Sequence, residues 1–292
     1  MLLGVPNFSE ARDEDAIAAI SAEFARGAAV VDRHTDPVHN RTVLTLSAAE
    51  TPIAPALAAG AAACVERIDM RNHEGAHPCV GALDVCPVVF LDDDSREAAT
   101  EQAQATAVAI ADLDVPVFLY GDLASAAERR ERAFYRRGGL AELTRRMSGG
   151  ELAPDLGPGE PHPSAGAALV AARPPLVAFN LLLDTDDVDV AAAIAAELRE
   201  AGGGPPGLRA IGIDLDGRAQ VSINVGDPIA VPLAIAIASV RRLAAQHGAR
   251  PVSGELVGLV PEAALAGLAE QDLPLPGFDP DVHVIERRLR VH

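Results

Sequence analysis

The residues best suited to chemistry lie together between residues 73 and 87. This stretch holds two histidines, two cysteines and two carboxylates: His73, Glu74, His77, Cys79, Asp84 and Cys86. Gly75, Pro78 and Gly81 disfavour a helix, so these side chains are expected on a loop leading into a buried strand at 85–91. Histidine transfers protons near neutral pH, and loops beside a rigid sheet often carry catalytic groups. The stretch is therefore a candidate site for general acid–base catalysis.

Two other roles fit the same residues. A loop histidine more often only hydrogen-bonds to backbone carbonyl groups. His73, His77 and Cys79 are also potential metal ligands, but their spacing matches no common zinc pattern. We therefore expect no metal, and the residue types alone leave a catalytic and a structural histidine both open.

A second polar motif, His39-Asn40-Arg41, leads into a strand expected at 41–47. A guanidinium can pair with a carboxylate through two parallel hydrogen bonds. Asn40 and Arg41 are therefore candidate substrate-binding residues. A turn asparagine and a solvent-exposed arginine explain the pattern equally well.

Residues 149–166 are rich in glycine and proline and cannot form regular structure. A loop of this length in a compact chain is often functional. Its second part could hold a flat or anionic ligand with backbone N–H groups, although it could equally be an ordinary linker. The candidate ligand-binding residues are Gly157, Pro158, Gly159, Glu160, Pro161, His162, Pro163, Ser164, Ala165 and Gly166. The loop has no GxGxxG or GxxxxGK pattern, so nucleotide binding has no direct support.

An arginine-rich stretch stands out in an otherwise acidic chain. Its members are Arg129, Arg130, Arg132, Arg136 and Arg137. Such a cluster could attract an anionic substrate. More often it forms a solvated helix face that pairs with nearby glutamates, and that is the expectation here.

The composition excludes several classes of protein. With 42 acidic and 24 basic side chains, the 292-residue chain has a formal net charge of −18, which repels nucleic acids and anionic membranes. Lysine is absent, which excludes Schiff-base, pyridoxal-phosphate and P-loop lysine chemistry. The three cysteines do not form a disulfide framework.

The first residues have neither the basic start nor the apolar stretch of a signal peptide. The longest uncharged apolar run, Pro228–Val240, is too short for a bilayer, which needs ~20 residues. We therefore expect a cytoplasmic protein with no nucleic-acid or membrane partner.

Hydrophobic periodicity and turn residues predict alternating strands and helices. Strands are expected at 28–32, 41–47, 85–91, 115–120, 168–172, 176–183, 208–215, 219–225 and 254–260. Helices are expected up to residue 24 and at 56–68, 95–113, 124–147, 188–199, 229–246 and 262–269. Asn7 or Ser9 would cap the first helix, and Ser95 would cap the helix expected at 95–113. Asp216-Gly217 predicts a type I′ hairpin turn.

Interleaved strands and helices predict layered α/β sandwiches, with a sheet on one side and helices on the other. The Pro174-Pro175 step is the best candidate boundary between two halves. The expected domains are residues 1–173 and residues 174–292.

An ordered set of motifs covers nearly the whole chain and resembles the formiminotransferase domain of the glutamate formiminotransferase family. The first are Val5-Pro6-Asn7-Phe8-Ser9-Glu10, Asn40-Arg41-Thr42-Val43, Ile68-Asp69-Met70 and the block from His73 to Pro87. Next come Val115-Pro116-Val117, Leu119-Tyr120-Gly121, Ala153-Pro154-Asp155, Gly157-Pro158 and Gly166-Ala167. The last are Ala172-Arg173, Ala178-Phe179-Asn180, Ala219-Gln220-Val221-Ser222, Asn224 and Leu256-Val257-Gly258-Leu259-Val260-Pro261. The cyclodeaminase domain fused to this one in animal enzymes is absent from the sequence.

The resemblance implies an α+β fold of two α/β-sandwich, ferredoxin-like subdomains, each with a mixed or antiparallel sheet and helices on one face. It implies transfer of a formimino group from N-formimino-L-glutamate to N5 of tetrahydrofolate in histidine degradation, with the folate between the two halves. His77 falls on the family's catalytic histidine and residues 157–166 on its folate-binding segment. Arg41 would anchor a substrate carboxylate with Asn40 and Asn180 nearby, and Asp84 would orient His77. A homodimer is expected.

This sequence departs from the pattern expected of the family at several positions. Cys79 replaces an arginine, Ala76 a glutamate, His34 an acidic residue and Ala165 an aromatic residue. These departures keep open a formiminotransferase with another donor or acceptor, such as formiminoglycine or a specialised amine. A folate-binding protein without turnover also remains open, as does a metal-binding protein that uses His34, His39, His73 and His77.

Overall fold

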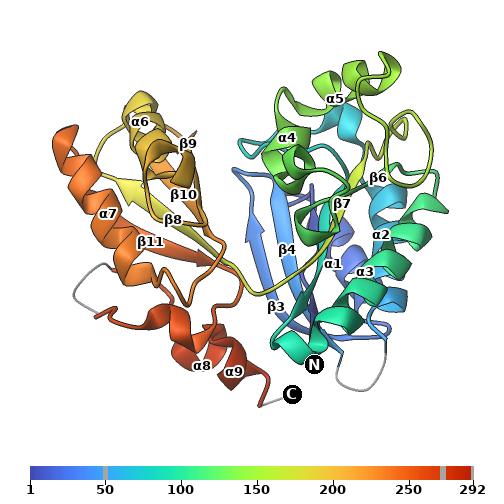
Figure 1. Ribbon diagram of the computed structural model, residues 1–292, viewed down its shortest axis with the longest axis horizontal. Coiled ribbons are helices and arrows are strands. Elements are labelled where there is room, and N and C mark those ends of the chain that lie inside the picture. Colours follow the sequence, from blue (N-terminus) through green and yellow to red (C-terminus); the bar gives the residue numbers. More distant parts are fainter. Residues whose placement is uncertain (49–51, 270–273, 291–292) are drawn as a thin grey trace. The chain divides into compact units, whose positions relative to one another are not determined.

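The computed structural model describes residues 1–48, 52–269 and 274–290. The chain forms two compact units, Met1–Pro174 and Pro175–His292, and each has its own hydrophobic core. Figure 1 shows both, coloured along the sequence. None of the helices in these described ranges is both long and apolar enough to cross a membrane.

The first unit is built on a mixed sheet. Its strands are β1 (Leu2–Gly4), β2 (Asn7–Phe8), β3 (Ala29–Asp36), β4 (Arg41–Ala48), β5 (Leu83–Phe90), β6 (Val117–Leu119) and β7 (Ala168–Arg173). The order is β1-β4-β2-β5-β7-β6, with β3 paired to the outer side of β4. β7 runs parallel to β5 and β6, whereas the other pairs are antiparallel.

Helices cover both faces of this sheet. The helices α1 (Glu14–Phe24), α2 (Ala54–Arg67) and α3 (Arg96–Ala111) pack side by side on one face, over a core that includes Phe8, Leu44 and Leu46 (Figure 1). The short helices α4 (Arg132–Arg136) and α5 (Gly139–Ser148) pack against Val85 and Phe118 on the other face. Single 3₁₀ turns lie at Met70–Asn72, Asp93–Ser95, Gly121–Leu123 and Ala127–Arg130.

The second unit has an antiparallel sheet in the order β11-β8-β10-β9. Its strands are β8 (Val177–Leu183), β9 (Leu208–Asp214), β10 (Ala219–Val225) and β11 (Pro251–Val257). The helices α6 (Val188–Leu198) and α7 (Leu233–Gln246) cover one face, and α8 (Pro280–His283) and α9 (Ile285–Arg288) follow. The 3₁₀ turns lie at Glu200–Gly202 and Glu262–Leu265. The α+β class expected from the sequence is confirmed.

The predicted hairpin turn is confirmed. Asp216 and Gly217 have φ angles of 50° and 80°, and Leu215 and Arg218 exchange backbone hydrogen bonds of 2.8 and 3.2 Å. Two successive positive φ angles define a type I′ turn, which an Asp-Gly pair adopts with little strain.

The predicted cap of the first helix is wrong, and so is one predicted helix. Asn7 begins β2, and α1 is instead capped by Asp13, whose side chain accepts from the Ala16 N–H. Ser95 does stand at the predicted N-cap position of α3, but its side chain makes no capping bond. The single helix expected at 124–147 is broken into a 3₁₀ turn, α4 and α5. Gly138 and Gly139, where α5 begins, take left-handed φ angles of 78° and 67°, so the chain does not continue from α4 into α5 as one helix.

Candidate functional site

His77 lies on the stretch of residues 74–82, called the His77 segment below, which is hydrogen-bonded to the turn between β3 and β4. The Ala76 N–H donates to the Val38 carbonyl at 3.1 Å. A Cβ atom at residue 75 would stand 2.4 Å from the His39 carbonyl oxygen, so only glycine allows this close approach. The backbone beside His77 is therefore fixed by direct contact with the rigid sheet.

Asn40 holds the same segment with its side chain. Its Oδ1 accepts from the Ala11 N–H at 2.9 Å, and its Nδ2 donates to the Glu74 carbonyl at 3.1 Å. Its φ angle of 47° is one that asparagine tolerates better than most residues. These contacts give Asn40 a structural part in positioning the His77 segment, and its predicted contact with substrate stays a prediction.

The His77 ring is half-buried, and the nearest charges that act on it strongly are positive. Its buried Nδ1 has no hydrogen-bond partner among the described residues, and the ring centre lies 5.8 Å from that of His39. Burial and the positive charges of Arg41 and Arg136 hold the pKa of His77 well below 6.5. The imidazole is therefore neutral at neutral pH, which is the form that accepts a proton.

The neighbouring His39 is paired with Asp36. The Nδ1 of His39 lies 2.9 Å from Asp36 Oδ2, and His39 is buried. Although burial alone would raise the pKa of Asp36, hydrogen bonds from the side chain and backbone of His39 lower it to about 2. The Asp36 carboxylate is therefore held in contact with His39, beside His77.

Asp84 is buried, but it does not hydrogen-bond to His77. Its Oδ1 accepts from the Val80 N–H at 2.8 Å, and its Oδ2 forms an ion pair with Arg136. Asp84 thus secures the end of the His77 segment and one arginine of α4. The prediction that Asp84 orients His77 stays a prediction. Asp84 could do so only indirectly, through its contacts with Val80 and Arg136.

Arg41 lies on the sheet face opposite the larger core. Leu44 and Leu46 point into that core, so the alternation of β4 puts Arg41 and Val43 on the other side. No hydrogen bond or ion pair to its guanidinium occurs within residues 1–48, 52–269 and 274–290, and its Nε is buried without a partner. Burial, followed by repulsion from Arg136, lowers the pKa of Arg41 to about 10.

The arginine-rich stretch differs from the solvated face expected from the sequence. Arg136 is buried against Asp84, and Arg129 pairs with Asp155 at 2.9 Å. Arg132 is half-buried, with its guanidinium carbon 6.0 Å from the centre of the Tyr120 ring. Arg130 is exposed and pairs with Asp122, as expected of a surface arginine. The prediction is wrong for Arg136 because its partner, Asp84, lies far away in the sequence.

The loop at 157–166 is docked beside the His77 segment. The Met70 N–H donates to the Ser164 carbonyl at 2.7 Å, and the Ala82 N–H donates to the Ala165 carbonyl at 2.8 Å. Gly166 has a φ angle of 71°, and a Cβ there would stand 2.3 Å from the Val80 oxygen. The structure therefore places this loop in direct contact with the segment that carries His77, so the candidate residues of both lie in one region.

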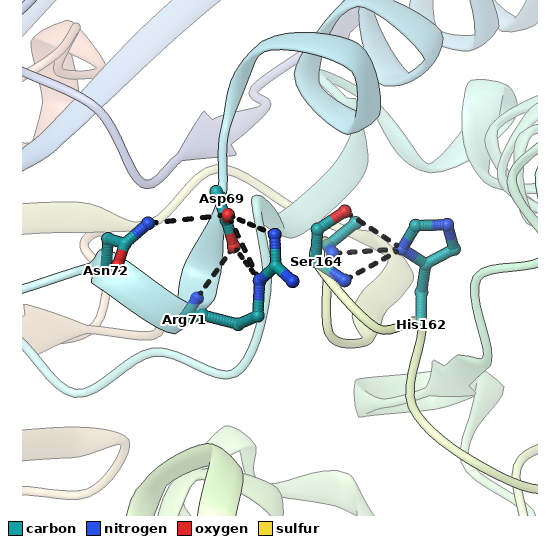
Figure 2. Close-up of polar contacts among 6 residues, drawn as sticks. Asp69, Arg71, Asn72, His162 and Ser164 are labelled. Atoms are coloured by element: carbon teal, nitrogen blue, oxygen red, sulfur yellow. Dashed lines mark hydrogen bonds and ion pairs between the residues drawn. The ribbon is translucent and has the colours of Figure 1, made fainter.

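The inner part of the loop is organised by His162. Figure 2 shows its Nδ1 accepting from the backbone N–H groups of Ser164 at 3.3 Å and Ala165 at 3.0 Å. The same view shows the Asp69–Arg71 pair, with Nη2 to Oδ2 at 2.6 Å. Because Nδ1 is the acceptor, the proton of a neutral His162 resides on Nε2.

Two further candidates have different surroundings. Asn180 lies on β8 of the second unit, where it is buried and its Nδ2 donates to Glu255 Oε2 at 3.0 Å. Burial raises the pKa of the Cys79 thiol to about 12, so this group is not a thiolate nucleophile. In the described ranges, His73, His77 and Cys79 are not gathered into a set of three ligating atoms.

Sequence reasoning missed the importance of Arg132 and Arg136. Both lie on α4 with a spacing of four residues, which places them on one face of a helix. The signal available in the sequence was this spacing around the apolar Tyr135, which is fully buried. It did not reveal that the same face meets Asp84.

Comparison with known proteins gives a consistent match along the chain. The model of the formiminotransferase domain, N-terminal subdomain, matches residues 1–173, and that of the formiminotransferase domain matches residues 178–271. The chain is 36% identical over 290 residues to the glutamate formimidoyltransferase of Streptococcus pyogenes serotype M1, covering 98% of this chain and 97% of that protein.

Two other relatives agree. The glutamate formimidoyltransferase of Thermoplasma acidophilum is 34% identical over 292 residues, covering 98% of this chain and 96% of that protein. The formimidoyltransferase-cyclodeaminase of Sus scrofa is 38% identical over 277 residues, which are 91% of this chain but only 51% of that protein.

Proposed function

Since the chain belongs to the formiminotransferase family, we propose that it transfers the formimino group of N-formimino-L-glutamate to N5 of tetrahydrofolate. The products are 5-formiminotetrahydrofolate and glutamate. The observation that carries this proposal is the neutral imidazole of His77 within the electrostatic influence of Arg41, whose buried Nε has no partner among the described residues. One group accepts a proton, and the other fits a carboxylate.

The reaction requires two proton movements. N5 attacks the formimino carbon and forms a C–N bond, which gives a tetrahedral intermediate. His77 takes the proton from N5 and then gives it to the nitrogen of glutamate, so that the bond between this nitrogen and the formimino carbon breaks. A general base and acid of this kind typically contributes ~10²–10⁴ in rate. The low pKa of His77 keeps it unprotonated before substrate binds.

Substrate binding falls to the groups around this imidazole. Arg41 anchors a carboxylate of the donor, because its guanidinium lacks a protein partner in the described chain. The loop at 157–166 offers the folate its backbone and the free Nε2 side of His162. Asn40 and Asn180 are proposed as further substrate contacts. We place the reaction in the cytoplasm and propose a homodimer, which light scattering of the purified protein tests.

A second candidate function is formimino transfer with another donor. It is favoured by Cys79, which stands where the family resemblance leads us to expect an arginine and which is a neutral thiol. A missing guanidinium next to the site removes one anion contact.

A donor screen with tetrahydrofolate separates the two functions. The measurement is formation of 5-formiminotetrahydrofolate by the wild type and by Cys79→Arg. We expect the wild type to use formiminoglutamate. If only Cys79→Arg uses it, the natural donor is a different formimino compound, and if neither protein uses any donor, the chain is not a formiminotransferase.

A further inference from the structure

The charges around His77 do not balance. Burial first, and then the positive charges of Arg132, Arg136 and, for His77, Arg41, lower the pKa of His77 and of Arg41. The carboxylates that oppose them at Arg41 are Asp84 and Asp36. Asp84 is bound to Arg136 and Asp36 to His39, so within the described part of the chain Arg41 and Arg132 are left without a carboxylate of their own.

The position of Arg132 follows from the geometry of α4. Arg136 is fixed at one end of the helix by its ion pair with buried Asp84. Arg132 lies one helical turn earlier on the same face, which turns its side chain toward the same region. There its guanidinium stacks over the Tyr120 ring at 6.0 Å, a contact that restricts its motion without neutralising its charge.

Two partly buried, unpaired guanidinium groups are costly to a folded protein. Burying a charge without a partner opposes folding, and placing like charges together adds repulsion. The cost is visible in the pKa of Arg41 and in that of Arg132, each lowered to about 10. Burial is the largest cause for both, and neighbouring arginines lower both further. Tyr120 opposes the shift at Arg132 but does not reverse it. A bound anion removes this cost, so such an arrangement is typical of an anion site.

We infer that Arg132 is a second carboxylate anchor beside Arg41, and that the pair selects a donor with two negative charges. This inference rests on the proposed function for the identity of the donor. It assigns one carboxylate of a dicarboxylate donor to Arg41 on β4 and the other to Arg132 on α4. Arg136, neutralised by Asp84, holds the helix that carries Arg132.

The inference has a consequence for the base. Burial is the largest cause of the low pKa of His77, and a dianion between Arg41 and Arg132 cancels the second cause, the positive potential of the arginines. The pKa of His77 therefore rises when a dicarboxylate binds, and the imidazole becomes a stronger base only in the loaded site.

The test is titration of the full chain with glutarate, a dianion, and with its monoamide glutaramate, a monoanion. We expect the wild type to bind glutarate at least about tenfold more tightly than glutaramate. Arg132→Gln should bring the two affinities within about twofold by weakening glutarate. Arg130→Gln is the matched control, since Arg130 is exposed and pairs with Asp122, and it should leave both affinities unchanged. Thermal melting verifies that each variant is folded.

A second measurement needs no variant of Arg132. The pKa of His77, followed by NMR and assigned from the signal lost in His77→Gln, should rise on saturation with glutarate. Equal binding of the two probes by the wild type, unaltered glutarate affinity in Arg132→Gln, or a His77 pKa that glutarate leaves in place would each overturn the inference.

Parallel transferase assays separate this inference from the proposed function. Dianion binding as described, without transfer from formiminoglutamate, supports the site and contradicts the proposed reaction. Transfer by Arg132→Gln with an unchanged KM for the donor contradicts the site while the proposed reaction stands.

Discussion

At the residue scale, Asp36 is the carboxylate whose ionised form gains most from its neighbours in the site, with His39 in direct contact. It lies at the β3–β4 turn that also carries the His77 segment. The side-chain contact and the N–H groups of Val38 and His39 all favour the ionised carboxylate. Asp36 therefore stabilises the folded state as long as it is charged.

This gives a prediction about stability and pH. The folded-state pKa of Asp36, about 2, lies below its ordinary value of 3.8. Its contribution is then fully present above about pH 4 and is lost as the pH falls toward 2. Asp36→Asn should lower the free energy of unfolding at pH 7 by roughly 1–2 kcal/mol, after allowance for partial exposure.

The measurement is urea unfolding of the wild type and Asp36→Asn at several pH values. Asp94→Asn changes an exposed carboxylate and serves as the control. If the two variants lose the same stability at pH 7, the His39 contact does not stabilise the ionised Asp36.

The buried pair of Asp84 and Arg136 leads to a second prediction. Asp84→Asn leaves the charge of Arg136 buried without a partner, so it should destabilise the protein by about 3–5 kcal/mol. The double variant Asp84→Asn, Arg136→Met removes both charges and should recover most of that loss. Chemical denaturation of the three proteins checks this, and a single variant as stable as the wild type would contradict it.

At the scale of elements, the docked position of the glycine-rich loop at 149–166 depends on Gly166 at its end more than on Gly159 in its middle. Gly166 combines a φ angle of 71° with a backbone contact that leaves no room for Cβ, whereas nothing lies within 4 Å of a Cβ at Gly159. Gly166→Ala should therefore cost about 2 kcal/mol or more. It should also displace the loop from the His77 segment. Gly159→Ala should change neither.

Proteolysis of the loop and thermal melting distinguish the two variants. We expect faster cleavage within 149–166 only in Gly166→Ala. Equal cleavage and equal melting temperatures would show that the docking at Gly166 does not hold the loop.

The elements show where sequence reasoning succeeds and where it ends. β5 and the β9–β10 hairpin were predictable, because an apolar run and an Asp-Gly turn are local signals. β1 and β2 were missed because they are short and gain their hydrogen bonds from β4 and β5, which follow much later.

The same limit applies to the site. His77 and the loop at 157–166 were identified because their residue types and motifs are visible in the sequence, and the structure places both segments in contact through Ala82 and Ala165. The burial of Arg136 on Asp84 could not be predicted, because it joins α4 to a strand that ends more than forty residues earlier in the sequence. The charge environment of His77 is thus a tertiary property.

At the scale of the whole molecule, the charge distribution is uneven. The chain carries a formal net charge of −18, yet Arg41, Arg132 and Arg136 gather around His77 in the first unit. A local positive site in an acidic protein favours small anions that can enter it and disfavours nucleic acids, which meet the negative surface first.

The first unit alone should also form the positive site around His77 and bind small anions there. Residues Met1–Pro174 contain all three of these arginines and a hydrophobic core of their own. We expect a fragment of residues 1–174 to unfold cooperatively and to bind glutarate. Circular dichroism and calorimetry check this, and a fragment without a cooperative transition would show that the core of the first unit is not sufficient for folding.

The proposed reaction depends above all on the half-buried, neutral imidazole of His77, which moves the proton between the two nitrogens. Its most direct test is the kcat for formimino transfer from formiminoglutamate to tetrahydrofolate by His77→Gln, compared with the surface control His247→Gln. We predict a loss of roughly 10²–10⁴-fold for His77→Gln with unchanged folding and no loss for the control. A folded His77→Gln protein that keeps the wild-type kcat would show that this imidazole does not carry the proton.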